Sequence, residues 1–73
     1  MPPKLPELPR ERVERVLRER IADGTYPAGS QLPAMDEIAV ELGVSRGTVA
    51  TVLRSMPEIR VIPGYGSFVV PPE

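Results

Sequence analysis

The sequence predicts a mostly helical α+β domain in which three helices are followed by a two-stranded β-hairpin. Residues 9–56 contain three stretches in which apolar side chains recur at helical spacing, and a glycine or a proline follows each stretch. Residues 59–70 contain two short runs rich in β-branched side chains, separated by a glycine-bearing loop. With only 73 residues, the helical part and the strand part together indicate one small domain.

The composition excludes several classes of function. The chain contains no cysteine and no histidine, so the usual thiol nucleophile, general base and soft metal ligands are absent. No apolar run approaches the roughly 20 residues that cross a bilayer, and the N-terminus lacks the pattern of a signal peptide. We therefore expect a cytoplasmic protein that is not an enzyme and that needs no cofactor or metal.

The first helix is expected from Pro9 to Ala22, after a proline-rich arm at residues 1–9 that we expect to be disordered. Proline suits the first helical position because its missing N–H would have no partner there. One apolar stripe runs along this helix, formed by Val13, Val16, Leu17 and Ile21. On the other face, acids precede arginines by four residues in the pairs Glu11–Arg15 and Glu14–Arg18. Gly24 is placed to end the helix in a left-handed conformation.

Two shorter helices follow, joined by the three-residue turn Gly43-Val44-Ser45. The second is expected over residues 35–42, with the stripe Met35, Ile38, Ala39 and Leu42. The third is expected over residues 45–56, where the hydroxyl of Ser45 can cap its first turn. Its inward stripe is Val49, Val52, Leu53 and Met56, and Pro57 stops it. Two short helices with such a turn form a helix-turn-helix.

The hairpin is expected from residues 59–62 and 67–70, with the four-residue loop 63–66 between them. The dipeptide Gln31–Leu32 is a candidate for a further short strand. The domain would thus span residues 10–70, with a tail at residues 71–73. Three helices and then a hairpin are the element order of a winged helix-turn-helix, in which residues 59–70 form the wing.

The charge distribution leaves nucleic-acid binding open. The net charge is −1, which does not favour it, because phosphate contacts normally supply much of the affinity. Basic side chains nevertheless outnumber acids in residues 1–22 and in residues 44–73, whereas residues 23–43 hold four acids and no base. A winged helix that serves as a protein-interaction module is the alternative interpretation of this acidic balance.

From Val13 to Val70 the chain resembles the DNA-binding domain of GntR-type bacterial transcription regulators. The matching segments are IADGTYPAGSQLP, IAVELGVSRGTV and GYGSFV, in this order along the chain. The resemblance implies sequence-specific binding of double-stranded DNA by a small transcriptional regulator. It also implies that the third helix lies in the major groove, and that the wing meets the adjacent minor groove or the backbone.

The residues expected at the DNA are Ser45, Arg46, Gly47, Thr48, Thr51, Arg54, Gly64, Tyr65, Gly66 and Ser67. The resemblance implies DNA contact by Ser45, Arg46 and Thr48 at the start of the third helix. It also implies that Gly64 and Gly66 are the glycines of the wing. Arginine reads guanine through O6 and N7, and helix N-terminal N–H groups can meet a phosphate. Each residue also has a structural interpretation, such as a cap for Ser45, a solvated surface charge for Arg54 and a hairpin contact for Tyr65.

The chain departs from the family pattern in four ways. Asp36 and Ala50 stand where the family usually has arginines, and the segment before the wing is about three residues shorter. As a fourth departure, we expect the chain to lack the C-terminal domain that, in this family, senses a small molecule and holds the dimer together. We therefore expect no small-molecule effector, and a monomer in isolation with any pairing confined to adjacent sites on DNA.

Overall fold

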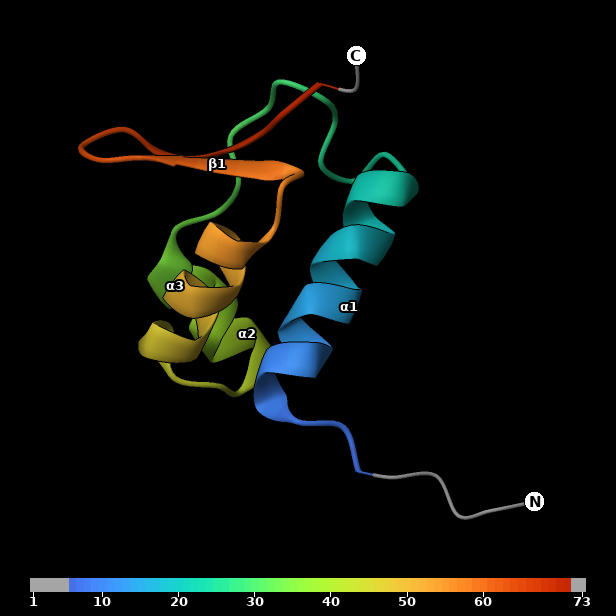
Figure 1. Ribbon diagram of the computed structural model, residues 1–73, viewed down its shortest axis with the longest axis vertical. Coiled ribbons are helices and arrows are strands. Elements are labelled where there is room, and N and C mark those ends of the chain that lie inside the picture. The colour runs from blue at the N-terminus through green and yellow to red at the C-terminus, as the bar shows by residue number, and fades with distance from the viewer. Residues whose placement is uncertain (1–5, 72–73) are drawn as a thin grey trace.

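The computed structural model describes residues 6–71, and within this range three helices precede one antiparallel hairpin (Figure 1). The elements are α1 (Pro9–Ala22), α2 (Met35–Leu42), α3 (Arg46–Ser55), β1 (Ile59–Ile62) and β2 (Gly66–Val69). The predicted fold class is confirmed. The hairpin β1–β2, called the wing below, lies across one end of the three helices (Figure 1).

The predicted bounds hold for α1, α2 and β1, whereas α3 is one residue shorter at each end and β2 is shifted by one residue toward the N-terminus. Helix α3 begins at Arg46, because Ser45 has extended backbone angles and acts as its N-cap. Strand β2 begins at Gly66 rather than at Ser67, because Gly66 pairs with Ile62 across the hairpin. The loop of the wing therefore has three residues, 63–65, instead of the predicted four. The predicted arm and tail fall largely outside the described residues.

The first turn of α1 differs from its prediction in the partner of Glu11. Its carboxylate Oε1 accepts a hydrogen bond from the backbone N–H of Leu8 at 2.8 Å, so the predicted pair with Arg15 is wrong. The reason is that N–H groups at a helix start have no acceptor within the helix, and a nearby carboxylate satisfies them. The other predicted pair is confirmed, with 3.2 Å between Glu14 Oε1 and Arg18 Nη2.

The helix-turn-helix is locked by local hydrogen bonds and by one contact to α1. Gly43 ends α2 in the left-handed region at φ +68°, which glycine adopts without steric cost. Ser45 Oγ accepts a hydrogen bond from the N–H of Thr48 at 3.1 Å. From α1, Arg12 Nη2 donates to the carbonyl of Leu42 at 2.7 Å, which satisfies one of the last carbonyls of α2.

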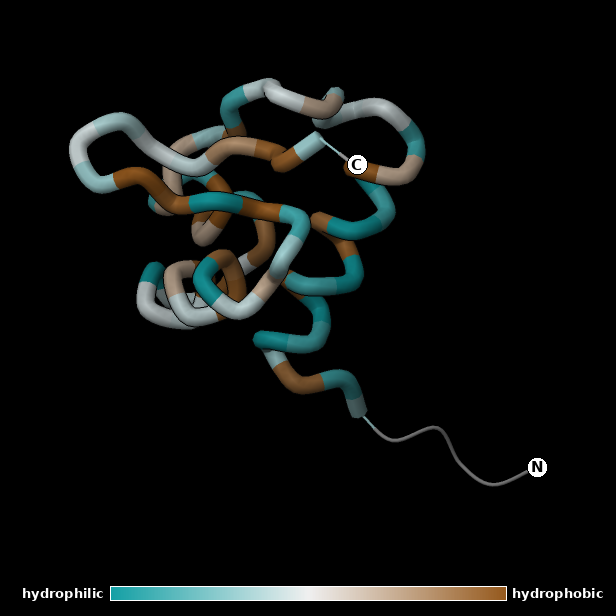
Figure 2. Tube along the Cα trace, turned by 45° about the horizontal axis from the view of Figure 1, so that its top comes forward, coloured by the Kyte–Doolittle hydropathy of each residue, from teal (hydrophilic) through white to brown (hydrophobic). Residues whose placement is uncertain are grey.

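The core lies where the helices meet under the wing. Its buried apolar residues are Val13, Leu17, Tyr26, Leu32, Ile38, Ala39, Val49, Val52, Leu53, Met56, Ile59 and Val69. In Figure 2, α1 alternates hydrophilic and hydrophobic segments along its length, as expected for a helix with one buried stripe. Each predicted helical stripe contributes to the core, so α2 and α3 are held with one face inward and the other toward solvent.

Candidate nucleic-acid interface

The exposed face of α3 is built from small and polar side chains between two arginines. Arg46 stands at the first position of the helix, and Arg54 stands in its last turn. Gly47 and Thr51 are exposed between them, and Ala50 is half-buried. No bulky side chain projects from this stretch, so another surface can approach the helix backbone closely.

Ser45 and Thr48 are engaged with each other at the start of α3. Besides the hydrogen bond from the Thr48 N–H, the two hydroxyl oxygens lie 2.8 Å apart. The predicted capping role of Ser45 is therefore confirmed. Its consequence is that the Thr48 N–H is already satisfied, whereas the N–H of Gly47, in the first turn, has no acceptor within the helix.

Arg46 is not an isolated cation, because Asp36 lies beside it. The distance between Arg46 Nε and Asp36 Oδ1 is 3.2 Å, and both side chains are strongly exposed, at 68% and 73%. The two residues stand ten positions apart in the sequence and each lies at the start of a helix, so the turn between α2 and α3 brings them together. This pair is not predicted from the sequence, because the two residues are too far apart along the chain for local spacing to link them.

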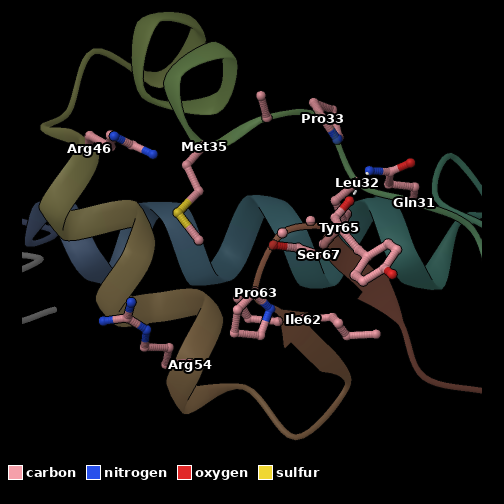
Figure 3. A pocket seen from close by; sticks show the side chains of 14 residues that line it. Gln31, Leu32, Pro33, Met35, Arg46, Arg54, Ile62, Pro63, Tyr65 and Ser67 are labelled. Carbon is pink, nitrogen blue, oxygen red and sulfur yellow. Dashed lines mark hydrogen bonds between the residues drawn. The ribbon is translucent and has the colours of Figure 1, made fainter.

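The two arginines border a hollow of about 510 Å³ between α3 and the wing. Figure 3 shows Arg46 and Arg54 on one side of the hollow and Ile62, Pro63 and Tyr65 of the wing on the other. Within residues 6–71, Arg54 has no carboxylate partner. Of the two arginines that border the hollow, Arg46 is paired with an acid and Arg54 is not.

The tip of the wing presents Tyr65 to solvent, with 74% of its surface exposed. Its backbone carbonyl accepts a hydrogen bond from Gln31 Nε2 at 2.8 Å. Gly64 and Gly66 flank it with φ of +82° and +120°, which only glycine adopts readily. A Cβ at residue 66 would also lie 2.6 Å from Gln31 Nε2. Gln31 therefore helps to hold the wing tip, a role that no motif in the sequence indicates.

The connection between α1 and α2 runs alongside β2 and fixes the angle of the wing. Gln31 forms an isolated antiparallel bridge with Phe68, so the candidate strand is reduced to one residue pair. The N–H of Leu32 donates to the carbonyl of Ser67 at 2.8 Å. Ser67 is only 4% exposed and belongs to the floor of the hollow, and we therefore leave it out of the proposed DNA contacts.

Two other kinds of site find no support in residues 6–71. Within this range no three aspartate or glutamate side chains gather where they could hold a metal ion. No described helix is long and apolar enough to cross a membrane.

Comparison with known proteins identifies close parallels for the sequence and the fold. The model of the bacterial regulatory proteins of the gntR family matches residues 9–69. The chain is 38% identical over 66 residues to the uncharacterized HTH-type transcriptional regulator Rv0494 of Mycobacterium tuberculosis. This alignment covers 86% of the chain and 27% of the relative. The chain thus spans about a quarter of the length of this curated relative.

Two solved structures share the architecture. A transcriptional regulator from Oenococcus oeni superposes with a TM-score of 0.78 at 26% identity, over 96% of this chain and 61% of that one. A chain in the crystal structure of mutant ORR3 in complex with the NTD of AraR superposes with a TM-score of 0.79 at 26% identity. That match covers 92% of this chain and 97% of the other. These matches agree with the element order and with the packing described above.

Proposed function

The chain belongs to the gntR family of bacterial regulatory proteins and carries its helix-turn-helix domain, and from this we propose that it binds double-stranded DNA sequence-specifically as a transcriptional regulator. The resemblance found in the sequence is confirmed by the family match over residues 9–69. The family and the fold are those of transcription regulators. The proposal includes action on DNA in the bacterial cytoplasm. The assignment of individual residues to the DNA is our proposal.

The observation that carries this proposal is the bare, exposed face of α3 between Arg46 and Arg54. A B-DNA major groove is about 12 Å wide and admits an α-helix. The small residues Gly47 and Ala50 would let α3 approach the base edges, and Thr51 offers a methyl group that suits a thymine methyl. The N–H of Gly47 would meet a phosphate at the positive end of the helix.

The two arginines would have different tasks. Arg46, at the N-terminal end of α3, would read a guanine through O6 and N7, because recognition helices contact base edges with their N-terminal residues. Arg54 lies at the other end, on the flank of the hollow, and would neutralise a phosphate. Ser45 and Thr48 would keep the start of the helix rigid through the contact between their hydroxyls. The same hydroxyls would face the DNA backbone.

The wing would supply a second contact beside the first. Tyr65 is exposed at its tip, and Gly64 and Gly66 allow the backbone there to approach a groove or a phosphate closely. Gln31 and the bridge to Phe68 hold the wing at a defined angle to α3. Major-groove contact by α3 and minor-groove or backbone contact by the wing would then occur together on one face of the duplex.

A titration against duplex DNA tests this function directly. Binding to mixed-sequence duplexes should be detectable at about 50 mM salt and should weaken steeply toward about 200 mM, because phosphate contacts release counterions. Chemical-shift changes in NMR spectra should map to α3 and to residues 63–66. Unchanged spectra with mixed-sequence and family-type duplexes at low salt would overturn the proposal. The protein-interaction module would then be the better explanation of the fold.

The oligomeric state is part of the same proposal. We propose that the chain is monomeric in solution and that pairing requires two adjacent sites on one duplex, where DNA raises the effective concentration. Sedimentation should give a monomer at micromolar concentration without DNA and two copies per duplex with two sites. A stable dimer without DNA would contradict this, and would place an interface on the protein itself.

A further inference from the structure

The ion pair between Arg46 and Asp36 joins the two helices at their N-terminal ends. The carboxylate oxygen Oδ1 lies 3.2 Å from Nε, the nitrogen nearest to the chain of the arginine. The two terminal nitrogens Nη1 and Nη2 form no hydrogen bond with any residue in the range 6–71, and Arg46 lines the hollow beside the wing. The carboxylate thus approaches the guanidinium most closely at Nε, and Nη1 and Nη2 remain available as donors.

This arrangement matters because arginine reads guanine with two parallel N–H donors in a fixed plane. An exposed arginine side chain is flexible, and ordering its rotatable bonds opposes binding. A carboxylate at Nε restricts the guanidinium to fewer orientations and leaves the pair Nη1 and Nη2 as the donors for O6 and N7. Lysine could not use this arrangement, since it lacks the planar fork.

We propose that Asp36 is a positioning residue that orients Arg46 for guanine recognition, at the expense of general affinity for DNA. The inference rests on the proposed function, because it requires α3 to lie in the major groove. In water an exposed pair such as this contributes little. Between α3 and a duplex, water is excluded, and the attraction between the two charges becomes stronger.

The same carboxylate has an opposite effect on non-specific binding. It stands at the DNA-facing end of α2 in the proposed docking, where it repels phosphates and offsets the charge of Arg46. Asp36 should therefore raise the ratio of specific to non-specific affinity while lowering the non-specific affinity itself. A residue with only a structural role would change both affinities in the same direction.

The test compares Asp36→Asn with Glu37→Gln. Glu37 is the next residue of α2, is exposed, and has no ion-pair partner among residues 6–71, so the second variant makes the same change of charge without touching Arg46. Selection of duplexes from a randomised DNA library by the wild type first yields its preferred site. Binding to that site, to single-base variants of it and to a mixed-sequence duplex is then measured for each protein. Thermal unfolding checks that both variants fold as the wild type does.

With Asp36→Asn, we expect the guanine preference at one position to fall by about 5-fold or more, toward the lower end of what a bidentate contact provides. Affinity for the mixed-sequence duplex should rise by up to about 5-fold, as removal of one repulsion in water allows. Glu37→Gln should raise the general affinity slightly and leave every base preference unchanged. In Arg46→Lys the preference should be lost, and adding Asp36→Asn should change it no further.

Other results would distinguish failure of the positioning role of Asp36 from failure of the proposed function. If the wild type selects a site and Asp36→Asn keeps every base preference, the positioning role is wrong and the proposed function stands. The same conclusion follows if Glu37→Gln reduces the guanine preference equally. If the wild type binds no duplex at low salt, the proposed function itself fails, and the positioning role fails with it.

Discussion

The arginines of α1 and those of α3 with the wing differ in what surrounds them. Four of the five arginines on α1 hold an acceptor on the protein, through the contacts Arg12–Leu42, Arg15–Glu7, Arg15–Glu19, Arg18–Glu14, Arg18–Glu58 and Arg20–Glu41. Of the three on α3 and β1, only Arg46 has an acid partner among residues 6–71, and Arg54 and Arg60 have none. The more basic segment of the sequence is thus the one whose charge is largely neutralised.

The number of basic residues in a segment is therefore a poor guide to a DNA-binding face. The pKa values of Arg15, Arg18 and Arg20 are raised, first of all by side-chain hydrogen bonds to Glu7, Glu58 and Glu41 respectively. Arginines engaged in this way stabilise the fold around α1, and their charge is largely neutralised before a phosphate can approach. A chain with a net charge of −1 can therefore still present available cations on one surface.

The largest effect is expected for Arg46→Ala. The variant should lose about 1–3 kcal/mol of binding free energy at the selected site, and its preference for guanine at one position should relax. Its stability should not change, because the side chain is exposed and its ion pair contributes little. Fluorescence anisotropy with the selected duplex measures the loss. The matched change on α1, Arg15→Ala, should leave affinity almost unchanged. An equal loss there would show that the arginines of α1 contribute to DNA binding as much as Arg46 does.

The reverse behaviour is expected for Arg12→Ala. Its guanidinium donates to the carbonyl of Leu42 in a partly buried contact, so the variant should lose about 1.5–2 kcal/mol of unfolding free energy, at the lower end of the range for hydrogen bonds from charged groups. Chemical denaturation measures this loss. DNA affinity should be preserved under conditions in which the variant is folded. Arg10→Ala is the control on the same helix, since Arg10 is exposed and makes no ion pair among residues 6–71. Equal losses from both variants would show that the contact with Leu42 does not stabilise the fold.

A smaller and sequence-independent effect is expected for Arg54→Ala. If Arg54 contacts one phosphate, the variant should bind all duplexes more weakly by a similar factor. The slope of the logarithm of affinity against the logarithm of salt concentration should decrease by about 0.9 in magnitude. Arg54→Lys should retain the slope, because it keeps the charge. A change in base preference with Arg54→Ala would instead assign this arginine to base recognition.

The smallest effect concerns Arg20 and Glu41, which join α1 to α2. The hydrogen bond from Arg20 lowers the pKa of Glu41 below its ordinary value of 4.5. A carboxylate with a lowered pKa in the folded state stabilises it above the ordinary pKa, and this contribution is lost as the pH falls through the lowered value. Because the pair is partly exposed, the contribution should be only about 0.2–1 kcal/mol.

Unfolding of the wild type and Glu41→Gln measures this contribution from neutral pH to about pH 3, across the range where carboxylates titrate. The two stability curves should be separated near neutrality and converge at the acidic end. Parallel curves would mean that Glu41 does not contribute through its charge. DNA affinity near neutral pH should be the same in both proteins, since this pair lies away from the exposed face of α3.

Much of the architecture follows from the sequence alone. The helical stripes repeat every three or four residues, and the helix ends at Gly43 and Ser45 depend on neighbours no farther away. Local preferences therefore determine α1, α2 and the start of α3. The prediction for β1 is confirmed, and that for β2 is shifted by one residue, since the strand spans 66–69 instead of 67–70. Glycine usually marks turns, whereas here Gly66 is paired with Ile62.

The availability of the charges and the position of the wing depend on contacts between elements that are far apart in the sequence. The contacts Arg46–Asp36, Arg12–Leu42 and Gln31–Tyr65 join residues that are 10, 30 and 34 positions apart. No periodicity or spacing in the sequence identifies such pairs, because each depends on the angle at which two packed elements meet. The sequence therefore determined where the arginines stand along the chain. Packing determined which of them meet an acid before any DNA is present.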